Sequence, residues 1–178
     1  MKWNTQSGGR LRRAFLGLGS NLGDRFAQLQ SAVEAIGRTP GIEIIRLSSI
    51  YETEPVGMKE QPAFYNMVVE AQTELEPKSL FHTIKEIETA IGRTTSVRWG
   101  PREIDIDLLY FDSAVISDPE FQVPHPEIAN RNFVLIPLAE IDGSFIDPRR
   151  RQPIRSLLAA SLDRSAVKRL DLVLSLSH

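Results

Sequence analysis

The chain has 178 residues, of which 42% are hydrophobic and 25% are charged, and its formal net charge is −2. This composition is typical of one globular domain with a sizeable core, and the small net charge provides no general attraction to nucleic acid or to an anionic membrane. Without cysteine, the chain has neither a disulfide framework nor cysteine-ligated zinc or iron–sulfur centres, as expected of a cytoplasmic protein.

The ends of the chain allow a simple division. Residues 1–12 are polar and basic, so they resemble neither a signal peptide nor a membrane span, and we expect a disordered leader there. Residues 13–178 are then expected to form a single domain. Because the chain starts with Met1 and carries a complete set of motifs, we expect a free-standing protein. We also expect a monomer.

In the first half of the chain the patterns alternate between strand and helix. A short strand over 13–19 ends in a polar loop, and apolar residues at helical spacing follow from Phe26, with Asp24 or Asn21 as the candidate cap. Residues 42–51 are rich in β-branched side chains, and residues 64–73 are continuously apolar, which indicates a central strand. A second helix is predicted from Pro77 to a stop at Gly92.

The second half begins with an acidic strand over 104–110 and a short hairpin around 117–119. A proline-rich loop over 123–126, a helical or extended piece over 130–138 and an amphipathic tail follow. The order predicts an α+β fold, a ferredoxin-like sandwich on a βαβ–βαβ core with extra strands and a C-terminal helical tail. We expect helices on one face of the sheet and ligands on the other face and at the strand ends.

The acidic strand is the strongest functional signal. Ile104, Ile106 and Leu108 alternate with Asp105 and Asp107, so both aspartates point to one face, about 7 Å apart at Cα. Adjacent carboxylates repel each other unless a cation compensates them, and Mg²⁺ binds to one or two carboxylates together with water and substrate phosphates. The alternative is a solvated sheet face, which a D-x-D pattern alone also fits.

Two long loops, 52–62 and 93–102, are candidate lids over a ligand. The second contains Trp99 and three arginines, Arg93, Arg98 and Arg102, and a guanidinium group matches phosphate geometry. Carboxylates for a metal and arginines for phosphates together suggest phosphoryl transfer. A tolerated surface insertion explains the first loop equally well.

Three further positions carry weaker signals. His125 lies between two prolines, which restrict its backbone, so its imidazole could contact a phosphate. Asn66 shares a strand face with Phe64, so an amide and a stacking ring could contact one heterocycle. Taken singly, each is also explained by packing. The glycines of 17–23 lack the spacing of a dinucleotide-binding turn, and the chain has no P-loop.

Taken together, these motifs resemble the 6-hydroxymethyl-7,8-dihydropterin pyrophosphokinase family of folate biosynthesis, over about residues 13–140. The matching segments, in the order of the family, are 18–23, 49–55, 61–66, Glu88 with 92–93, 98–108, 123–126 and 130–133.

The resemblance implies transfer of a pyrophosphoryl group from ATP to the hydroxymethyl oxygen of the pterin, with two Mg²⁺ ions held by Asp105 and Asp107. It implies catalytic contacts to phosphate from Arg93, Arg102 and His125. The implied pterin pocket consists of Thr53, Val56, Phe64, Asn66, Trp99 and Phe133. The implied ATP contacts are Glu88, Arg98, His125 and Arg131.

Two departures from the family pattern and three alternatives remain. Phe64 stands where many relatives have tyrosine, and Thr94-Thr95-Ser96 is uncharged where a second basic residue is common after Arg93. The alternatives are a metal-dependent nucleotidyltransferase or phosphoesterase, a non-enzymatic ligand-binding module, and one domain of a multifunctional folate enzyme.

Overall fold

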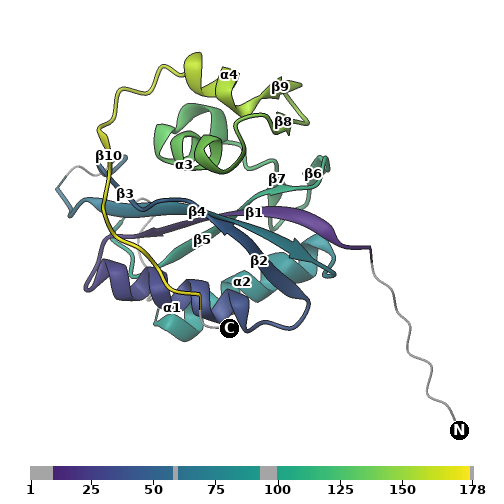
Figure 1. Ribbon diagram of the computed structural model, residues 1–178, viewed down its shortest axis with the longest axis horizontal. Helices are drawn as coiled ribbons and strands as arrows, with labels where there is room; N and C mark the ends of the chain where they lie inside the picture. The colour runs from purple at the N-terminus through teal and green to yellow at the C-terminus, as the bar shows by residue number, and fades with distance from the viewer. Residues whose placement is uncertain (1–9, 58–59, 93–99, 177–178) are drawn as a thin grey trace, which may run out of the picture.

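A computed structural model of the chain describes residues 10–57, 60–92 and 100–176, which fold around a six-stranded sheet (Figure 1). Its strands are β1 (Arg12–Ser20), β2 (Ile42–Leu47), β3 (Tyr51–Thr53), β4 (Phe64–Thr73), β5 (Asp105–Phe111) and β10 (Val167–Arg169). Two small hairpins pair β6 (Ile116–Ser117) with β7 (Gln122–Val123) and β8 (Ile146–Asp147) with β9 (Gln152–Pro153). The helices are α1 (Arg25–Gly37), α2 (Pro77–Ile91), α3 (Asn132–Asp142), α4 (Ile154–Ala159) and the 3₁₀ turn η1 (Ile128–Asn130).

The sheet is antiparallel and its strands are not in sequence order. The main path is β10-β3-β4-β1-β5, and β2 pairs with β4 on the same side as β3. The prediction of a mixed α/β chain, with the long strand over 64–73 in a central position, is therefore confirmed. So is the predicted hairpin around 117–119. The leader expected over residues 1–12 lies mostly outside the described residues, and Arg12 already belongs to β1.

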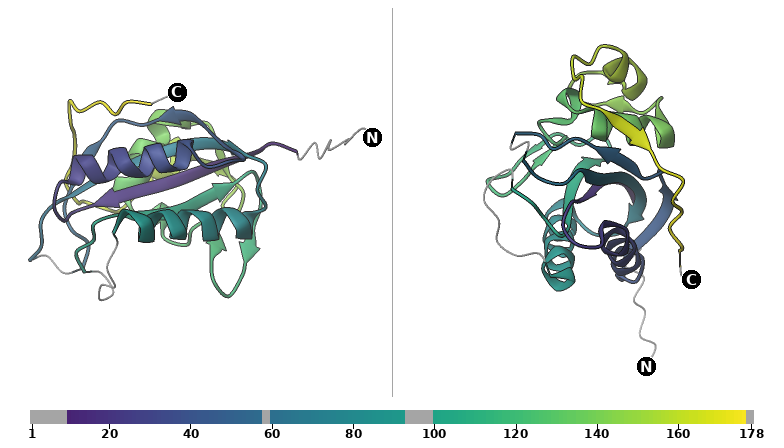
Figure 2. Two further views of the ribbon diagram at one scale, coloured as in Figure 1. Left: turned by 90° about the horizontal axis from the view of Figure 1, so that it is seen from below. Right: turned by 90° about the vertical axis from the view of Figure 1, so that its left-hand side faces the viewer.

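Helices lie on both faces of this sheet. Helices α1 and α2 cover one face, whereas α3 and α4 lie over part of the other (Figures 1 and 2). The expectation that helices cover a single face is therefore wrong. The reason lies in β1, where Phe15 packs on the side of α3 and its neighbours Ala14 and Leu16 pack on the side of α1 and α2.

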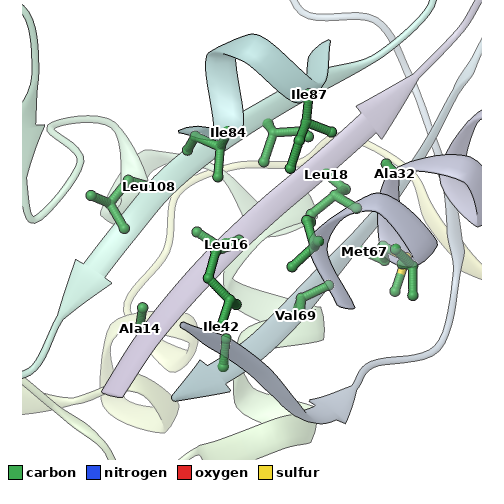
Figure 3. Packing of buried hydrophobic residues seen from close by; sticks show 14 of the residues in the cluster. Ala14, Leu16, Leu18, Ala32, Ile42, Met67, Val69, Ile84, Ile87 and Leu108 are labelled. Atoms are coloured by element: carbon green, nitrogen blue, oxygen red, sulfur yellow. The ribbon is translucent and has the colours of Figure 1, made fainter. Parts of the chain in front are cut away.

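The larger core lies between the sheet and the pair α1 and α2 (Figure 3). It includes Leu16 and Leu18 of β1, Val69 of β4, Leu108 of β5 and Ile84 of α2, all of them buried. A second core around Phe15, Leu135 and Leu138 joins α3 to the opposite face. Burial on both faces fixes the central strands and gives the molecule a rigid platform.

Local signals explain where the helices begin and end. The Asp24 side chain accepts a hydrogen bond from the Ala27 amide at 3.0 Å, so Asp24 is the α1 cap and Asn21 is not. Pro77 opens α2, and Gly92 closes it in the left-handed conformation, at φ 106°. Both ends of α2 were predictable from these residue types.

Two predictions about strands and tail need correction. The strand expected over 42–51 is divided, because the Ser48 hydroxyl accepts the Val68 amide at 2.8 Å and so takes the place of a backbone carbonyl in the ladder. The last part of the chain is not only helical, since β10 follows α4 and joins the sheet beside β3. No helix in the described part of the chain is both long enough and apolar enough to cross a membrane.

Candidate functional site

A cavity of about 400 Å³ opens on the sheet face that α3 and α4 leave partly uncovered, a volume typical of small-molecule sites. Of the fourteen residues proposed from the sequence, three (Arg93, Arg98 and Trp99) lie outside the described residues. Of the other eleven, ten line this cavity: Thr53, Val56, Phe64, Asn66, Arg102, Asp105, Asp107, His125, Arg131 and Phe133.

The register of the sheet explains why these residues meet. Asn66 of β4, Gly19 of β1 and Asp105 of β5 lie side by side across three strands, and Gly17 lies beside Asp107 one step along. Because alternate residues of a strand share a face, both acids, both glycines and Asn66 face the cavity. The sheet therefore brings one amide and two carboxylates to the same side of the cavity, which we call its floor.

Gly17 and Gly19 have no side chains, so they leave space for a ligand above the floor of the cavity. A Cβ atom on Gly19 would lie 2.6 Å from Oδ1 of Asn66, and one on Gly17 would meet the Leu109 side chain at 3.3 Å. Both glycines line the cavity. Their spacing in the sequence indicates no dinucleotide-binding turn, and in the structure they leave room above β1.

The acid pair is held in place by cations on both sides. Nη1 of Arg102 lies 2.8 Å from Oδ2 of Asp105, and Nζ of Lys85 lies 3.9 Å from Oδ1 of Asp107. Burial, followed by the nearby charge of Asp105, raises the pKa of Asp107 to about 6, against the lowering effect of Lys85 and the arginines. A carboxylate with a raised pKa beside a second carboxylate in a cavity is a frequent sign of a functional site.

The donor set fits a hard divalent cation. Among the described residues no group of three or more His, Asp or Glu side chains could hold a metal by itself. Mg²⁺ does not need one, since it binds through one or two carboxylates and takes its other ligands from water and substrate phosphates. Asp105 and Asp107, on one face of a fixed strand, could provide those two carboxylates.

Glu88 is the one described candidate that does not line the cavity, and its side chain is only 3% exposed. Its Oε1 accepts the Ile106 amide at 2.6 Å, while Nζ of Lys85 donates to the same Oε1 at 2.8 Å and to the Ile106 carbonyl at 2.7 Å. The pair thus holds both peptide groups of the residue between the two aspartates. Burial raises the pKa of Glu88, and the contacts with Lys85 and Ile106 oppose that effect.

His125 enters the cavity from the loop after β7. Its backbone amide donates to the Leu109 carbonyl at 3.0 Å, and its Nδ1 accepts the Glu127 amide at 3.3 Å. Burial, followed by the positive charge of Arg131, lowers the pKa of His125 to about 4. The imidazole is therefore neutral at pH 7, with Nδ1 as acceptor and the proton on Nε2.

The other wall of the cavity suits a flat polar ring. Nδ2 of Asn66 donates to the Thr53 hydroxyl at 2.6 Å, so the amide is fixed in orientation, and both side chains are almost completely buried. Phe64 and Phe133 add aromatic surface, and Val56 adds apolar surface. Phe64 and Asn66 share one face, as the alternation of β4 predicted.

Asn21 connects the two loops proposed as lids and was missed as a site residue. Its Nδ2 donates to Oε1 of Gln61 at 3.0 Å and to the Pro62 carbonyl at 3.1 Å, and its Oδ1 accepts the Arg102 amide at 2.7 Å. Lys85 was missed as well. The partners of both residues lie far along the chain, Arg102 for Asn21 and Ile106 for Lys85, so no local pattern indicates these contacts.

These features are typical of an enzyme of the small-molecule phosphotransferase class, because paired carboxylates, guanidinium groups and aromatic side chains share one cavity on a mixed α/β scaffold. The family model for 7,8-dihydro-6-hydroxymethylpterin-pyrophosphokinase matches residues 15–143, and the chain belongs to this family.

Individual relatives agree with the family model. The 2-amino-4-hydroxy-6-hydroxymethyldihydropteridine pyrophosphokinase of Methylorubrum extorquens is 43% identical over 161 residues, which is 90% of this chain and 100% of that protein. The enzyme of the same name from Bacillus subtilis is 46% identical over 72% of this chain and 77% of its own length. The wild-type HPPK-DHPS of Plasmodium falciparum, solved with pteroate, has the same fold at TM-score 0.69 and 19% identity, over 84% of this chain. This chain spans 42% of that longer one.

Proposed function

We propose that this chain transfers the diphosphoryl group of ATP to the hydroxymethyl oxygen of 6-hydroxymethyl-7,8-dihydropterin, the reaction that its relatives are named for. The hydroxyl oxygen forms a bond to the β-phosphorus, the bond between that phosphorus and the α,β-bridging oxygen breaks, and AMP leaves while the hydroxyl proton is released. One observation carries the proposal: Asp105 and Asp107 of β5 line the same cavity as the Asn66 side-chain amide, which is hydrogen-bonded to Thr53.

Asp105 and Asp107 are the residues that would hold magnesium, and we propose two ions by resemblance to the family. Bound there, Mg²⁺ would neutralise phosphate charge and favour ionisation of the attacking hydroxyl. The protein supplies the placement. Glu88 and Lys85 fix the peptide groups between the acids, so we place Glu88 in this proposal as a positioning residue for β5 rather than as a contact of the nucleotide.

We assign the part of the cavity near Arg102, Arg131 and His125 to the phosphates of ATP, and we call it the phosphate end. Arg102 precedes the acidic strand, and Arg131 and His125 line the same cavity. Guanidinium groups bind phosphate oxygens through paired hydrogen bonds, and the neutral His125 ring offers its Nε2–H to an oxygen that gains charge. Arg93 and Arg98 complete the proposed set by resemblance, outside the described residues.

The heterocycle end recognises a flat ring with a hydrogen-bonding edge. With Nδ2 donating to Thr53, the Oδ1 of Asn66 faces the floor above Gly19 and can accept an N–H of the substrate. Phe64 and Phe133 offer ring faces and Val56 closes the pocket, with Trp99 as a further aromatic wall by resemblance. Closure of the loops would exclude water, which competes as a nucleophile.

The finer fold assignment, cellular location and oligomeric state are part of this proposal. The antiparallel order β5-β1-β4 followed by β2 and β3, with α1 and α2 on one face, supports a ferredoxin-like core of two split βαβ units. A cytoplasmic monomer fits a cysteine-free enzyme that acts on ATP and a small heterocycle.

Release of AMP from ATP, measured with and without hydroxymethyldihydropterin, tests the function. We expect AMP only when ATP, Mg²⁺ and the heterocycle are all present, in a 1:1 ratio to pterin diphosphate. AMP without the heterocycle would instead indicate a nucleotidyltransferase or phosphoesterase, and binding of both compounds without turnover would indicate a ligand-binding module.

A further inference from the structure

The end of the chain returns to the sheet as β10, beyond residues 15–143 that match the family. Strand β10 pairs antiparallel with β3, so that Val167 lies opposite Thr53 and Arg169 opposite Tyr51 (Figures 1 and 2). Hydrogen bonds extend this pairing at both ends, from the Leu170 amide to the Ile50 carbonyl at 2.9 Å and from the Glu54 amide to the Ala166 carbonyl at 3.4 Å. Strand β3 is thus covered along its whole outer edge.

Strand β3 needs this cover because it is short and carries part of the substrate pocket. It has three residues, and its inner edge pairs with β4, with Thr53 opposite Phe64. A strand of this length with a single neighbour is marginally stable. Any displacement of β3 would move Thr53, which orients Asn66, and Glu54 and Val56, which follow along the same wall.

The segment 166–175, which we name the C-terminal strap, is itself anchored on two other elements. Nε of Arg169 donates to the Ser49 hydroxyl at 2.8 Å, and Glu140 of α3 accepts both the amide and the hydroxyl of Ser49. Further along, Leu170 and Leu174 pack against the core under α1 and α2. Gln30 of α1 exchanges two hydrogen bonds with the Ser175 backbone, at 2.8 and 3.0 Å. The strap therefore connects β3 to both helical layers.

We propose that the C-terminal strap is a positioning element for the heterocycle pocket, one that fixes β3 from outside the sheet and thereby sets the Thr53–Asn66 pair. This inference rests on the function proposed above. The acid pair and Arg102 lie on and before β5, which β4 and β1 separate from β3. Loosening the strap therefore weakens binding of the heterocycle and leaves the nucleotide end unchanged.

The variant Lys168→Pro tests this directly, with Lys168→Ala as the matched control. Lys168 is exposed and lies opposite Glu52, between the two flanking hydrogen bonds, so by antiparallel alternation its N–H points to β3. Proline removes that donor, whereas alanine keeps it. The measurements are the dissociation constants of hydroxymethyldihydropterin and ATP, kcat, and amide hydrogen exchange over 51–53 in the free protein.

We expect Lys168→Pro to weaken heterocycle binding roughly three- to tenfold, the equivalent of one lost hydrogen bond, with faster exchange at Tyr51 and Thr53. ATP affinity and kcat should stay within about twofold of the parent chain, and Lys168→Ala should match the parent throughout. Gln30→Ala, which releases the far end of the strap, should weaken heterocycle binding in the same direction if Lys168→Pro does not fold.

Two results would overturn the proposal. If exchange over 51–53 rises but heterocycle affinity does not change, the strap stabilises β3 but does not position the heterocycle pocket. If both ligands weaken equally, the strap is a general stabiliser. Failure of the parent chain to bind the heterocycle would overturn the proposed function together with this inference, and it is distinguishable because it is seen before any substitution.

Discussion

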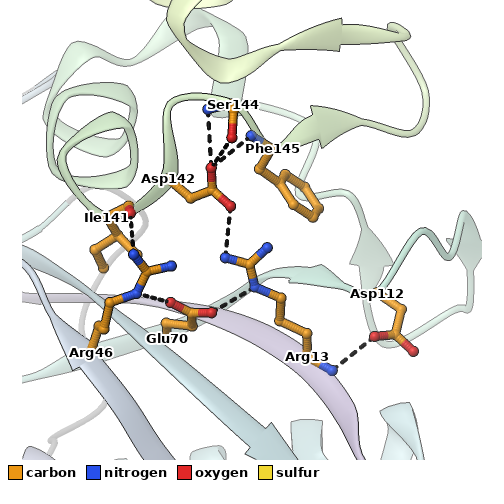
Figure 4. A network of polar contacts seen from close by, with 8 residues as sticks. All are labelled: Arg13, Arg46, Glu70, Asp112, Ile141, Asp142, Ser144 and Phe145. Carbon is orange, nitrogen blue, oxygen red and sulfur yellow. Dashed lines mark hydrogen bonds and ion pairs between the residues drawn. The ribbon is translucent and has the colours of Figure 1, made fainter.

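Strand β1 passes two charged clusters on the same sheet face, and they differ in how their acids are arranged. At its beginning, Glu70 bridges Arg13 and Arg46, with Arg13 also bonded to Asp142, so that two acids meet two bases (Figure 4). At its end, Asp105 and Asp107 lie next to each other beside a cavity. Burial would raise the pKa of Asp142, but hydrogen bonds from Ser144 and Arg13 lower it. For Asp107, burial and Asp105 together raise it.

The contrast suggests a structural role for the first cluster and fits the role proposed above for the second. In the first cluster every acid has a base, and Arg13 also lies over the Phe15 ring, with its guanidinium carbon 4.6 Å from the ring centroid. That arrangement joins β1, β2 and β4 to α3. In the second cluster the two acids are neighbours, and Arg102 and Lys85 only partly offset their repulsion, so the pKa of Asp107 stays raised. This repulsion weakens the free protein, and in the function proposed above the two carboxylates would hold a cation. Substitutions should therefore affect stability in one cluster and turnover in the other.

The largest effect is expected for Asp107→Asn. Because the contribution of a metal to a phosphoryl-type transition state is several kcal/mol, turnover should fall about a thousandfold or more. The midpoint of thermal unfolding should not fall, because the repulsion with Asp105 disappears. AMP release and calorimetry measure the two quantities.

Its neighbour on the opposite face is the control. Ile106 is completely buried, so Ile106→Asp places an unpaired charge in the core and should unfold the protein. An active Asp107→Asn variant would refute the assignment of the metal ligand.

A stability effect without a catalytic effect is expected for Glu70→Ala. Removing this carboxylate leaves Arg13 and Arg46 facing each other, part-buried, which should cost about 2–4 kcal/mol of unfolding free energy. The rate per folded molecule should not change. Glu74→Ala, at an exposed position just after the same strand, is the control and should alter neither quantity. A loss of turnover in the folded Glu70 variant would show that the two clusters are coupled.

A smaller effect on activity is expected for substitution of Glu88, which holds the backbone between Asp105 and Asp107. In Glu88→Gln the oxygen that accepts from Lys85 and from the Ile106 amide becomes neutral. The ion pair with Lys85 is lost and both hydrogen bonds weaken, so the Mg²⁺ concentration for half-maximal rate should rise about 10- to 100-fold. Glu86→Gln makes the same chemical change on the exposed side of α2 and should have no effect. ATP binding measured without Mg²⁺ separates the two roles of Glu88, since a rise in that dissociation constant alone would indicate direct contact with the nucleotide.

The two floor glycines sharpen the comparison within the cavity. Gly19→Ala forces the Asn66 amide to move, because the new Cβ would lie 2.6 Å from its oxygen, and heterocycle binding should weaken about tenfold. Gly17→Ala meets only the flexible end of Leu109 at 3.3 Å and should change binding little. Equal effects of the two substitutions in a titration would mean that Asn66 does not contact the heterocycle.

The sequence predicts what depends on nearby residues. The bounds of β4, the ends of α2 and the shared face of Asp105 and Asp107 all follow from local alternation, a proline and a glycine. The hold of Lys85 and Glu88 on Ile106 does not, because it depends on which face of α2 lies along β5. Strand β10 was equally hidden, since three residues with two exposed charges carry no strand pattern and pair only when β3 is already in place.

The smallest effect is on the pH dependence of stability, and it comes from the lowered pKa of His125. With its pKa lowered to about 4 by burial and Arg131, the folded ring stays neutral at pH 5, whereas the unfolded ring, with a pKa of about 6.5, takes up a proton. The stabilisation is therefore complete above pH 6.5 and is lost as the pH falls towards 4. Between pH 7 and pH 5.5 the parent chain should lose about 1 kcal/mol more stability than His125→Gln.

Denaturant unfolding at the two pH values measures this difference, and NMR of the ring protons gives the pKa itself. Binding of ATP places negative charge near Nε2, so the same titration should move upward when ATP is present. Because Arg131 lowers the pKa in the free protein, Arg131→Gln should also move it upward, without ATP. If the ring titrates near 6.5 in the free protein, neither burial nor Arg131 controls it, and the neutral donor role assigned to Nε2 is wrong. A titration near 4 that ATP leaves unmoved would instead place the phosphates away from His125, and the phosphate end of the cavity would then consist of arginines alone.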